Sequence, residues 1–301
     1  MYHRVAKEMP SNQFYDPGMY ISADSLENHI KQIRKYFKIV TLNEIINIDK
    51  SRRDCFCAIT FDDGWYDNYL FAYPILKKYD IPATIFLPIN YIGTENEFWF
   101  QVFWDAAQTA YDKGILNRFI KDLSIYLPDR TASIGESLKD IVESLKRIQP
   151  VELNQILQNI SKSFQLKTDF RRNTINWKEV KEMENEGILF GSHGANHFIL
   201  TDIDSNCKKN EIVESFKFLE KKLNNFSAFF CYPNGEWDNE CINIVKSIGY
   251  KGAVTTKLGI LGKRQNVFLL NRIGMHNDIS NKRGLFWFRI FQAIAGIKGS
   301  K

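Results

Sequence analysis

The sequence predicts an α/β protein in which parallel strands alternate with helices. Residues 55–61 combine β-branched and aromatic side chains as a buried strand does, residues 68–79 follow with a helical repeat of apolar positions, and residues 82–87 form the clearest strand pattern of the chain. This order favours parallel pairing, because two parallel strands are usually joined by a crossover helix. We therefore expect an α/β barrel or an open α/β sheet.

The elements on either side of this unit continue the alternation. Near the start, Ser22 or Asp24 is placed to cap a helix whose apolar positions recur at three- and four-residue steps. A strand at residues 37–41 and a short helix to about residue 48 follow. In the second half of the chain, the patterns predict helices at 177–187 and 211–223 and strands at 188–190, 227–232, 251–255 and 267–273.

The segment from about residue 97 to residue 175 does not follow this alternation. Four helical patterns succeed one another there, at residues 98–112, 115–127, 136–148 and 151–164. We interpret the segment as a helical insertion in a main domain that spans residues 1–283. It opens with Phe98, Trp99 and Phe100, whose rings suit either core packing or a wall for a sugar or a lipid.

The composition is that of an ordinary globular protein. The 301 residues are 44% hydrophobic and 25% charged, and the net charge of +5 is too small to argue for nucleic-acid binding. Five cysteines, an odd number without a repeating spacing, indicate reduced thiols in a reducing compartment. We find no apolar stretch typical of a secretory signal or of a bilayer span. We therefore expect a cytoplasmic protein.

Two adjacent carboxylates, Asp62 and Asp63, follow the first of these strands and meet Gly64. Neighbouring side chains of a strand point to opposite faces, so the two can do different work at one site only if the chain bends, which a glycine permits. Adjacent carboxylates repel one another unless a cation intervenes. A metal ion held by one of them would leave the other free as a base. The alternative is a plain polar turn.

His193 and His197 follow the apolar run at residues 188–190, and the chain has only five histidines. At a spacing of four, the two rings can converge on one ion if the segment between them is a turn. The alternative is a surface loop. Together with Asp63 they would give three ligands and open coordination positions, as in a catalytic rather than a structural zinc site. The sequence therefore predicts a divalent ion, with zinc first and cobalt or nickel as alternatives.

In their order along the chain, these motifs resemble those of the polysaccharide deacetylases of carbohydrate esterase family 4, which share the NodB-homology fold. Residues 60–64 match the first family motif, residues 192–197 the second, and residues 230–235 the third. The sequence at Tyr2 and His3 resembles an amino-terminal motif of the exopolysaccharide branch. The resemblance implies a distorted (β/α) barrel of about seven parallel strands.

The resemblance also implies roles for particular residues. Asp62 would be the general base, and the backbone N–H of Tyr232 would bind the oxyanion beside the metal ion. His3 is the first candidate for the general acid that protonates the leaving amine. Alternatively, His3 is a structural histidine at the end of a strand, whose hydrogen bonds are made within the core.

The sequence departs from the family pattern in several places, including a last motif near His276 that is not cleanly reproduced. Gly194 replaces the usual serine or threonine, so we expect a hydrogen bond behind the metal ligands to be missing. Phe198 replaces a common proline. The arginine that usually steadies the base is absent near residues 228–230, and Arg272 is our candidate to replace it through a two-pronged contact with Asp62.

The tail, residues 284–301, contains a helical pattern that is apolar on almost every side. An aromatic helix of this kind with basic neighbours suits a membrane interface, and the alternative is a helix docked on the barrel or on a partner subunit. The basic neighbours are Lys282, Arg283, Arg289, Lys298 and Lys301.

Taken together, the candidate metal ligands and the family resemblance imply a metal-dependent hydrolase that removes an N-acetyl group from an acetamido-sugar. A cytoplasmic enzyme cannot reach finished wall polymer, so we expect a lipid-linked or oligosaccharide intermediate of surface-glycan synthesis as substrate. If the tail binds lipid, the protein would lie at the inner face of the membrane. The alternatives are an O-acetyl esterase or amidase on the same fold, or a catalytically inactive sugar-binding protein, against which the intact Asp62 argues.

Overall fold

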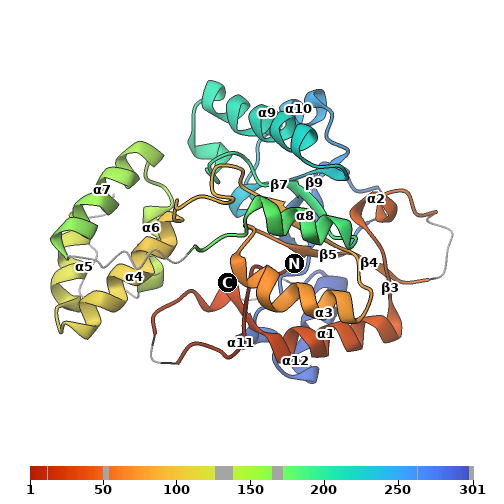
Figure 1. Cartoon of the computed structure of the whole chain (residues 1–301), viewed down its shortest axis with the longest axis horizontal. Helices are drawn as coiled ribbons and strands as arrows, with labels where there is room; N and C mark the ends of the chain where they lie inside the picture. The colour runs from red at the N-terminus through yellow and green to blue at the C-terminus, as the bar shows by residue number, and fades with distance from the viewer. Residues whose placement is uncertain (12, 50–53, 126–137, 165–171, 263, 298–301) are drawn as a thin grey trace. The chain divides into compact units, whose positions relative to one another are not determined.

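A fully parallel β-sheet of six strands forms the centre of the larger part of the described chain (Figure 1). The computed structural model describes residues 1–301 apart from 12, 50–53, 126–137, 165–171, 263 and 298–301. The strands lie in the order β10-β9-β8-β7-β6-β5, so each strand lies beside the one before it in the sequence. They are β5 (Ile59–Phe61), β6 (Ala83–Leu87), β7 (Leu189–Ser192), β8 (Phe226–Cys231), β9 (Gly252–Leu258) and β10 (Leu270–Arg272).

The expected count of about seven strands is not confirmed: the sheet has six strands among the described residues, and the amino-terminal residues enter it only as a short pairing. At the β5 edge, the N–H of Tyr2 donates to the carbonyl of Thr60 at 2.9 Å. At the β10 edge, the amino nitrogen of Met1 donates to the carbonyl of Ile273, just after β10, at 3.0 Å. Residues 1–3 therefore join the two edges of the sheet through backbone hydrogen bonds.

Two small parallel sheets lie beside the main one. Strand β1 (Arg4–Ala6) pairs with β2 (Tyr20–Ser22), and β3 (Lys38–Ile39) pairs with β4 (Phe56–Cys57). The single strand predicted at residues 55–61 is thus divided in two. The backbone of its first half bonds to β3 and that of its second half to β6, so one stretch of sequence belongs to two sheets.

Helices pack against the sheet in two main apolar clusters. Side chains of β5, β6 and β7 pack with those of α1 (Ala23–Tyr36), α3 (Tyr73–Lys78), α8 (Trp177–Asn185) and α12 (Arg283–Ala295). Side chains of β8 and β9 pack with those of α9 (Ser205–Lys222) and α10 (Asn239–Ile248). The shorter helices are η1 (Pro17–Met19), α2 (Leu42–Ile45), η2 (Asn68–Ala72), η3 (Leu200–Asp202), η4 (Pro233–Gly235) and α11 (Asn277–Ser280).

The helix boundaries follow local capping more closely than apolar periodicity. Ser22 caps α1 as predicted, since its Oγ accepts the N–H of Ser25 at 3.2 Å. Helix α9 begins at Ser205, well before the predicted residue 211, where the carboxylate of Asp204 accepts the N–H of Cys207 at 3.0 Å. Its first turns are polar, and for that reason periodicity alone did not reveal them. The helix predicted at residues 68–79 is a π-helical stretch, η2, followed by α3.

The chain forms two compact units, and the central sheet belongs to the larger one. The smaller consists of Pro10–Asp16 and Glu95–Arg171. Its helices are α4 (Trp99–Asp112), α5 (Leu116–Ser124), α6 (Leu138–Leu145) and α7 (Pro150–Ser163). Its core includes Phe119, whose ring meets that of Phe164 edge-on with centroids 5.2 Å apart. The predicted helices at 115–127 and 136–148 extend into residues 126–137, which lie outside the described residues.

Candidate active site

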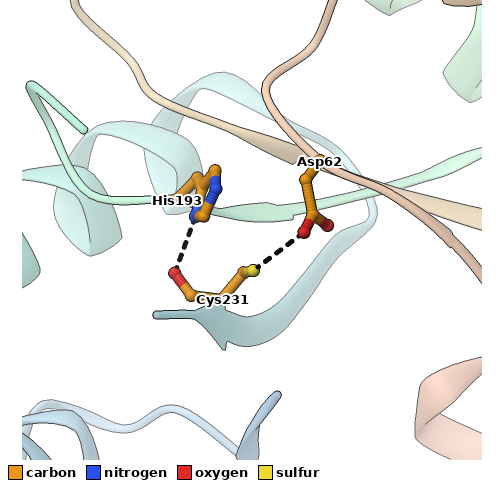
Figure 2. A group of neighbouring side chains, drawn as sticks. All are labelled: Asp62, His193 and Cys231. Atoms are coloured by element: carbon orange, nitrogen blue, oxygen red, sulfur yellow. Dashed lines mark hydrogen bonds between the residues drawn. The ribbon is translucent and has the colours of Figure 1, made fainter. Parts of the chain in front are cut away.

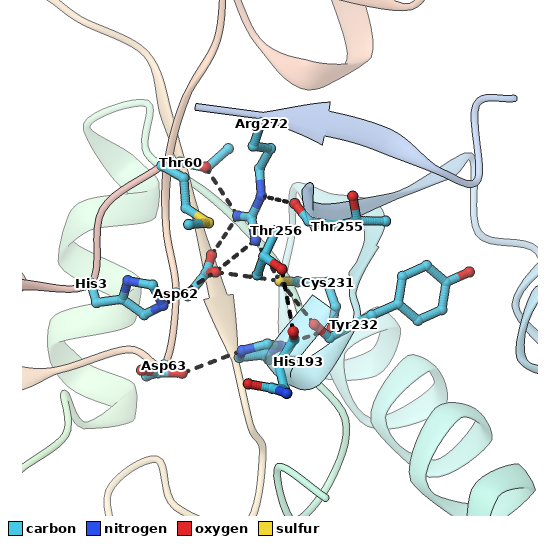
Figure 3. Close-up of polar contacts among 12 residues, drawn as sticks. His3, Thr60, Asp62, Asp63, His193, Cys231, Tyr232, Thr255, Thr256 and Arg272 are labelled. Carbon is cyan, nitrogen blue, oxygen red and sulfur yellow. Dashed lines mark hydrogen bonds and ion pairs between the residues drawn. The ribbon is translucent and has the colours of Figure 1, made fainter. Parts of the chain in front are cut away.

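Reactive side chains gather at one edge of the central sheet (Figure 3). Asp62 and Asp63 follow β5, His193 follows β7, Tyr232 follows β8, and Arg272 is the last residue of β10. The carboxyl ends of parallel strands meet at the same edge, which is where α/β enzymes keep their reactive groups. The topology therefore brings four distant parts of the sequence together.

A sharp bend separates the two carboxylates. Asp63 and Gly64 both have left-handed backbone conformations, with φ angles of 72° and 65°. A Cβ atom at Gly64 would lie 2.8 Å from the side chain of Leu87 and 2.9 Å from that of Ile92, so any larger residue would force these buried side chains to shift. The bend that the sequence predicted at this glycine is present.

Asp63 presents one carboxylate oxygen to two histidines. Its Oδ2 accepts a hydrogen bond from Nε1 of Trp65 at 2.9 Å. Its Oδ1 is buried and accepts no hydrogen bond of good geometry within the described part of the chain. This Oδ1 lies 3.3 Å from Nε2 of His193 and 3.2 Å from Nε2 of His197.

The environment of His193 shows whether these groups fit a metal ion. Its Nδ1 lies 2.8 Å from the carbonyl oxygen of Cys231, a contact that requires a proton on Nδ1. In the neutral ring Nε2 then carries a lone pair, as a metal-bound histidine does. Burial favours the neutral acid at Asp63, but contact with N–H groups of the two imidazoles outweighs it and holds the pKa of this carboxyl well below its ordinary value. A divalent cation would take the place of these ring protons. An ionised oxygen facing two imidazole nitrogens fits a divalent cation.

Glu211, on α9, stabilises the turn that carries His197 by accepting hydrogen bonds from its backbone. Its Oε2 accepts the N–H groups of Ala195 at 3.0 Å and Asn196 at 2.8 Å. Gly194 has a φ angle of 79°, and a Cβ atom there would lie 3.0 Å from the same Oε2. His197 is left-handed too, with φ 57°, a conformation that needs support from its surroundings. The turn for which we expected a missing hydrogen bond at Gly194 is thus held by Glu211.

The guanidinium of Arg272 forms an ion pair with the carboxylate of Asp62 (Figure 3). Its two terminal nitrogens donate to Oδ1 and Oδ2 of Asp62, both at 2.7 Å, and its Nε donates to the carbonyl of Thr255 at 2.8 Å. Burial would raise the pKa of Asp62, but the charge of Arg272 outweighs it and lowers the pKa to about 2. The geometry is the two-pronged contact that we expected of Arg272.

His3 lies on the other side of Asp62, with its Nε2 3.7 Å from Oδ2 of the carboxylate. Its backbone carbonyl accepts a hydrogen bond from Nδ2 of Asn68 at 2.7 Å, which fixes the segment that carries the ring. Burial lowers the pKa of His3 below its ordinary value, although the charges of Asp62 and Asp63 oppose the shift. Burial thus favours the neutral ring of His3, which lies within reach of the carboxylate.

Cys231 completes the surroundings of Asp62 (Figure 2). Its Sγ lies 3.5 Å from Oδ2 of Asp62 and 3.2 Å from a terminal nitrogen of Arg272, and burial raises the pKa of the thiol. Among the described residues, possible ligand atoms of Asp62, His193 and Cys231 also lie within 4.8 Å of one another. Both oxygens of Asp62 are already bound by Arg272, and Nδ1 of His193 by a carbonyl, so this second group is a weaker candidate for a metal ion.

Tyr232 does not present a free N–H in this structure. Its backbone N–H donates to the carbonyl of Val254 at 3.2 Å, because the residue continues the pairing of β8 with β9. Its ring is fully buried and points away from the carboxylates (Figure 3). The oxyanion role that the resemblance implied therefore requires this hydrogen bond to be shared or broken.

Sequence reasoning missed the supporting contacts around these residues. Trp65 lies inside the first motif, and an indole donor two residues after Asp63 was a usable signal. Glu211 looked like any acid on an amphipathic helix, and Cys231 like a small core residue. Asn68 follows the motif closely, but its bond to His3 depends on the tertiary fold.

Comparisons with known proteins agree with these motifs. A sequence model of the family described as polysaccharide deacetylase matches residues 49–118 and 155–253, more than half of the chain. The matched segments contain both carboxylates and both histidines of the candidate site. The chain belongs to the polysaccharide deacetylase family.

Individual relatives are distant. The protein YxkH of Bacillus subtilis (strain 168) is 22% identical over 232 residues, which cover 77% of this chain but only 56% of YxkH, so the chain spans about half of that relative. A poly-beta-1,6-N-acetyl-D-glucosamine N-deacetylase of Staphylococcus epidermidis is 25% identical over 216 residues, 63% of this chain and 69% of that protein. The Streptococcus pyogenes deacetylase PplD has a similar fold, with a TM-score of 0.59 at 20% identity over 98% of this chain and 96% of PplD.

Proposed function

We propose that this protein is a divalent-metal-dependent hydrolase that removes the N-acetyl group from an acetamido-sugar. The observation that carries the proposal is the buried Oδ1 of Asp63, which faces Nε2 of His193 and Nε2 of His197 at 3.3 and 3.2 Å. Two imidazole nitrogens and a carboxylate oxygen suit zinc, with cobalt or nickel as alternatives. When bound, such an ion supplies Lewis acidity, which makes water acidic and polarises a carbonyl.

Side chains of this protein would transfer the protons of the reaction. Asp62 is the proposed general base, kept ionised and in one orientation by Arg272, and it would take a proton from the attacking water. His3, 3.7 Å from Asp62, is the proposed general acid for the leaving amine. The proton that Asp62 takes from the attacking water would pass to His3 and from there to the leaving amine; the lowered pKa of His3 makes its charged ring a ready donor. The backbone N–H of Tyr232 is the proposed oxyanion donor, once it is released from Val254.

Family membership supports a sugar substrate, and the name of the Staphylococcus epidermidis relative supports an N-acetyl group on that sugar. We propose a lipid-linked or oligosaccharide intermediate of surface-glycan synthesis, handled in the cytoplasm. In this proposal residues 1–283 form the catalytic domain and residues 97–175 are an insertion in it, while the tail from residue 284 gives peripheral contact with the membrane.

The proposal is tested first by metal content, which requires no guess at the substrate. The protein is purified without chelator, and bound metal is measured by elemental analysis beside Asp63→Ala and His193→Ala, with His276→Ala as the control histidine. We expect about one zinc, cobalt or nickel per chain in the wild type and the control, and none in the two ligand variants. A folded wild type that stays empty after zinc is added would contradict the metal site.

The second step measures acetate release from N-acetylated oligosaccharides and from O-acetylated and simple amide substrates. Release from the N-acetylated sugars, lost in Asp62→Asn, is the expected result. Preference for an O-acetyl group or a simple amide would favour the esterase or amidase alternatives. A protein that binds metal and sugar without turnover would favour the sugar-binding alternative.

A further inference from the structure

Helix α12 exposes an apolar side along its whole length. Phe288 and Phe291 are each 55% exposed, and Ile294 is 59% exposed. Leu285, 39% exposed, precedes them at the same three-residue step. Side chains three apart are neighbours on a helix surface, so these four residues form one continuous row that winds across the exposed half of the helix. We call it the α12 stripe. Isolated exposed apolar side chains are common, but a contiguous stripe of this kind marks an interaction surface.

The opposite side of α12 is already anchored in the larger unit. Phe286, Ile290 and Ala293 are buried, and the ring of Phe286 packs against that of His29 with centroids 4.4 Å apart. Trp287 lies between the two sides and meets the exposed ring of Tyr36 edge-on at 5.1 Å. The helix is therefore held in place by its buried side. Its exposed phenylalanines add nothing to that packing and need another explanation.

The charges around the stripe indicate what it meets. From residue 279 to residue 301 the sequence has five basic residues and no acidic one. Lys282 and Arg283 are exposed at the first turn of α12, and its first turn has no acidic residue. Basic residues at a helix amino terminus oppose the helix dipole, so these two do not serve the stability of the helix. Their positive charge beside an apolar stripe complements a surface that is both negatively charged and apolar.

We propose that the α12 stripe docks this protein on an anionic lipid bilayer, with the phenylalanines among the acyl chains and Lys282 and Arg283 against the headgroups. Tyr36 and Trp287 would lie at the headgroup level, where amphipathic rings are favoured. No helix of the described residues is long and apolar enough to cross a membrane. The helix would therefore lie along the surface. This inference rests on the membrane contact that the proposed function includes and specifies its surface and its lipid class. The surface lies apart from the metal ligands, so failure of docking and failure of the hydrolase activity are measured separately.

The test is co-sedimentation of the full chain with vesicles of phosphatidylcholine, with and without phosphatidylglycerol. We expect binding to the anionic vesicles, weakened by salt. The partition coefficient of the double variant Phe288→Ser/Phe291→Ser into the vesicles should be at least roughly tenfold lower than that of the wild type. The charge-reversal variant Lys282→Glu/Arg283→Glu should bind the anionic vesicles roughly tenfold less and lose the preference for them.

The matched control is Tyr111→Ser/Val151→Ser, which removes two apolar side chains that are 58% and 73% exposed on the smaller unit. It should bind vesicles as the wild type does. Circular dichroism and metal content, measured on every variant, separate loss of docking from loss of the fold or of the metal site. A wild type that binds neither vesicle, or a Phe288→Ser/Phe291→Ser variant that binds as well as the wild type, would overturn the proposal. A dimer of the wild type that this same variant dissociates would assign the stripe to a second copy of the chain instead.

Discussion

Arg272 binds both carboxylate oxygens of Asp62 at 2.7 Å, although 210 residues separate the two in the sequence. Only 7% of Arg272 and 1% of Asp62 are exposed to solvent. Breaking a buried ion pair of this kind on one side leaves an uncompensated charge, which typically costs about 3–5 kcal/mol of stability. The orientation of the proposed base on the first strand of the sheet is therefore set by the last strand.

The substitution Arg272→Lys keeps a positive charge but removes the fork that holds both oxygens. We expect kcat/KM to fall roughly 100-fold. The pKa of Asp62, lowered to about 2 mainly by Arg272 against the effect of burial, should rise, so the acidic limb of the pH–rate profile moves to higher pH. The measurement is kcat/KM against pH, with the exposed Arg264→Lys as control. A profile that keeps its acidic limb would show that Arg272 does not set this pKa.

The substitution Glu211→Gln weakens the acceptor that holds the N–H groups of Ala195 and Asn196. We expect metal affinity to fall about 10- to 100-fold, because contacts behind a metal ligand keep it in position. Competition against a chelator measures this affinity, and Glu220→Gln, on the exposed side of the same helix, is the control. Equal affinity in all three proteins would mean that the turn holds its shape without Glu211.

Two glycines with left-handed backbone give a matched pair. Gly187 has φ 88° and no atom within 4 Å of an added Cβ, whereas a Cβ at Gly64 would lie 2.8 Å from Leu87. We expect Gly187→Ala to cost about 1 kcal/mol from backbone strain alone. Gly64→Ala should cost roughly 2–4 kcal/mol, because overpacking adds to that strain, and should also weaken metal binding through Asp63. Urea unfolding gives both values, and equal costs would argue against the crowding at Gly64.

His29 should make the protein less stable in mild acid. Its Nε2 lies 2.7 Å from the carbonyl of Ser280, and its Nδ1 lies 3.2 Å from the hydroxyl of Tyr2, so the neutral ring is satisfied. Burial outweighs the Ser280 contact and lowers the pKa of His29 from 6.5 to about 4. Proton uptake therefore favours the unfolded state. This contribution to stability is complete above about pH 6.5 and is lost as the pH falls towards 4, by up to roughly 3 kcal/mol.

The measurement is the free energy of unfolding in urea between neutral pH and about pH 4.5 for the wild type and for His29→Phe. The variant should be less stable at neutral pH, because two hydrogen bonds are lost, but its stability should fall less steeply with acid. His3, whose pKa is lowered as well, contributes equally to both proteins. Parallel curves would exclude His29 as the source of the acid sensitivity.

Most residues of the candidate site could be identified from the sequence because its motifs are local. Asp62 and Asp63 are adjacent, and His193 and His197 are four residues apart, so their chemistry could be recognised without the fold. Arg272 was found because a guanidinium was missing elsewhere and the base needed one. Glu211 could not be found in this way, since its contact with the histidine turn exists only after α9 packs against the end of β7.

The fold was predictable where periodicity is strong and less so where one stretch serves two partners. The alternation of strands and helices around residues 82–87 indicated the parallel sheet correctly. The division of residues 55–61 into β4 and β5 could not be predicted, because both halves have the same apolar pattern. The count of about seven strands is not confirmed, since residues 1–3 pair through a few backbone bonds without forming a full strand of the sheet.

Met1 contacts Ile273, which lies 272 residues away in the sequence. His3, the proposed general acid, follows Met1 by two residues. During synthesis the chain emerges from its amino end, so the two carboxylates and both histidines are made long before residues 270–275. A nascent chain could therefore pair residues 1–3 with β5 and assemble the metal ligands while the proposed base still lacks its arginine and Met1 still lacks its contact with Ile273. Closing so long a loop costs entropy that only the completed sheet can offset. The proposed base would thus gain its arginine only when the final strand pairs, so the candidate site would be completed late in folding.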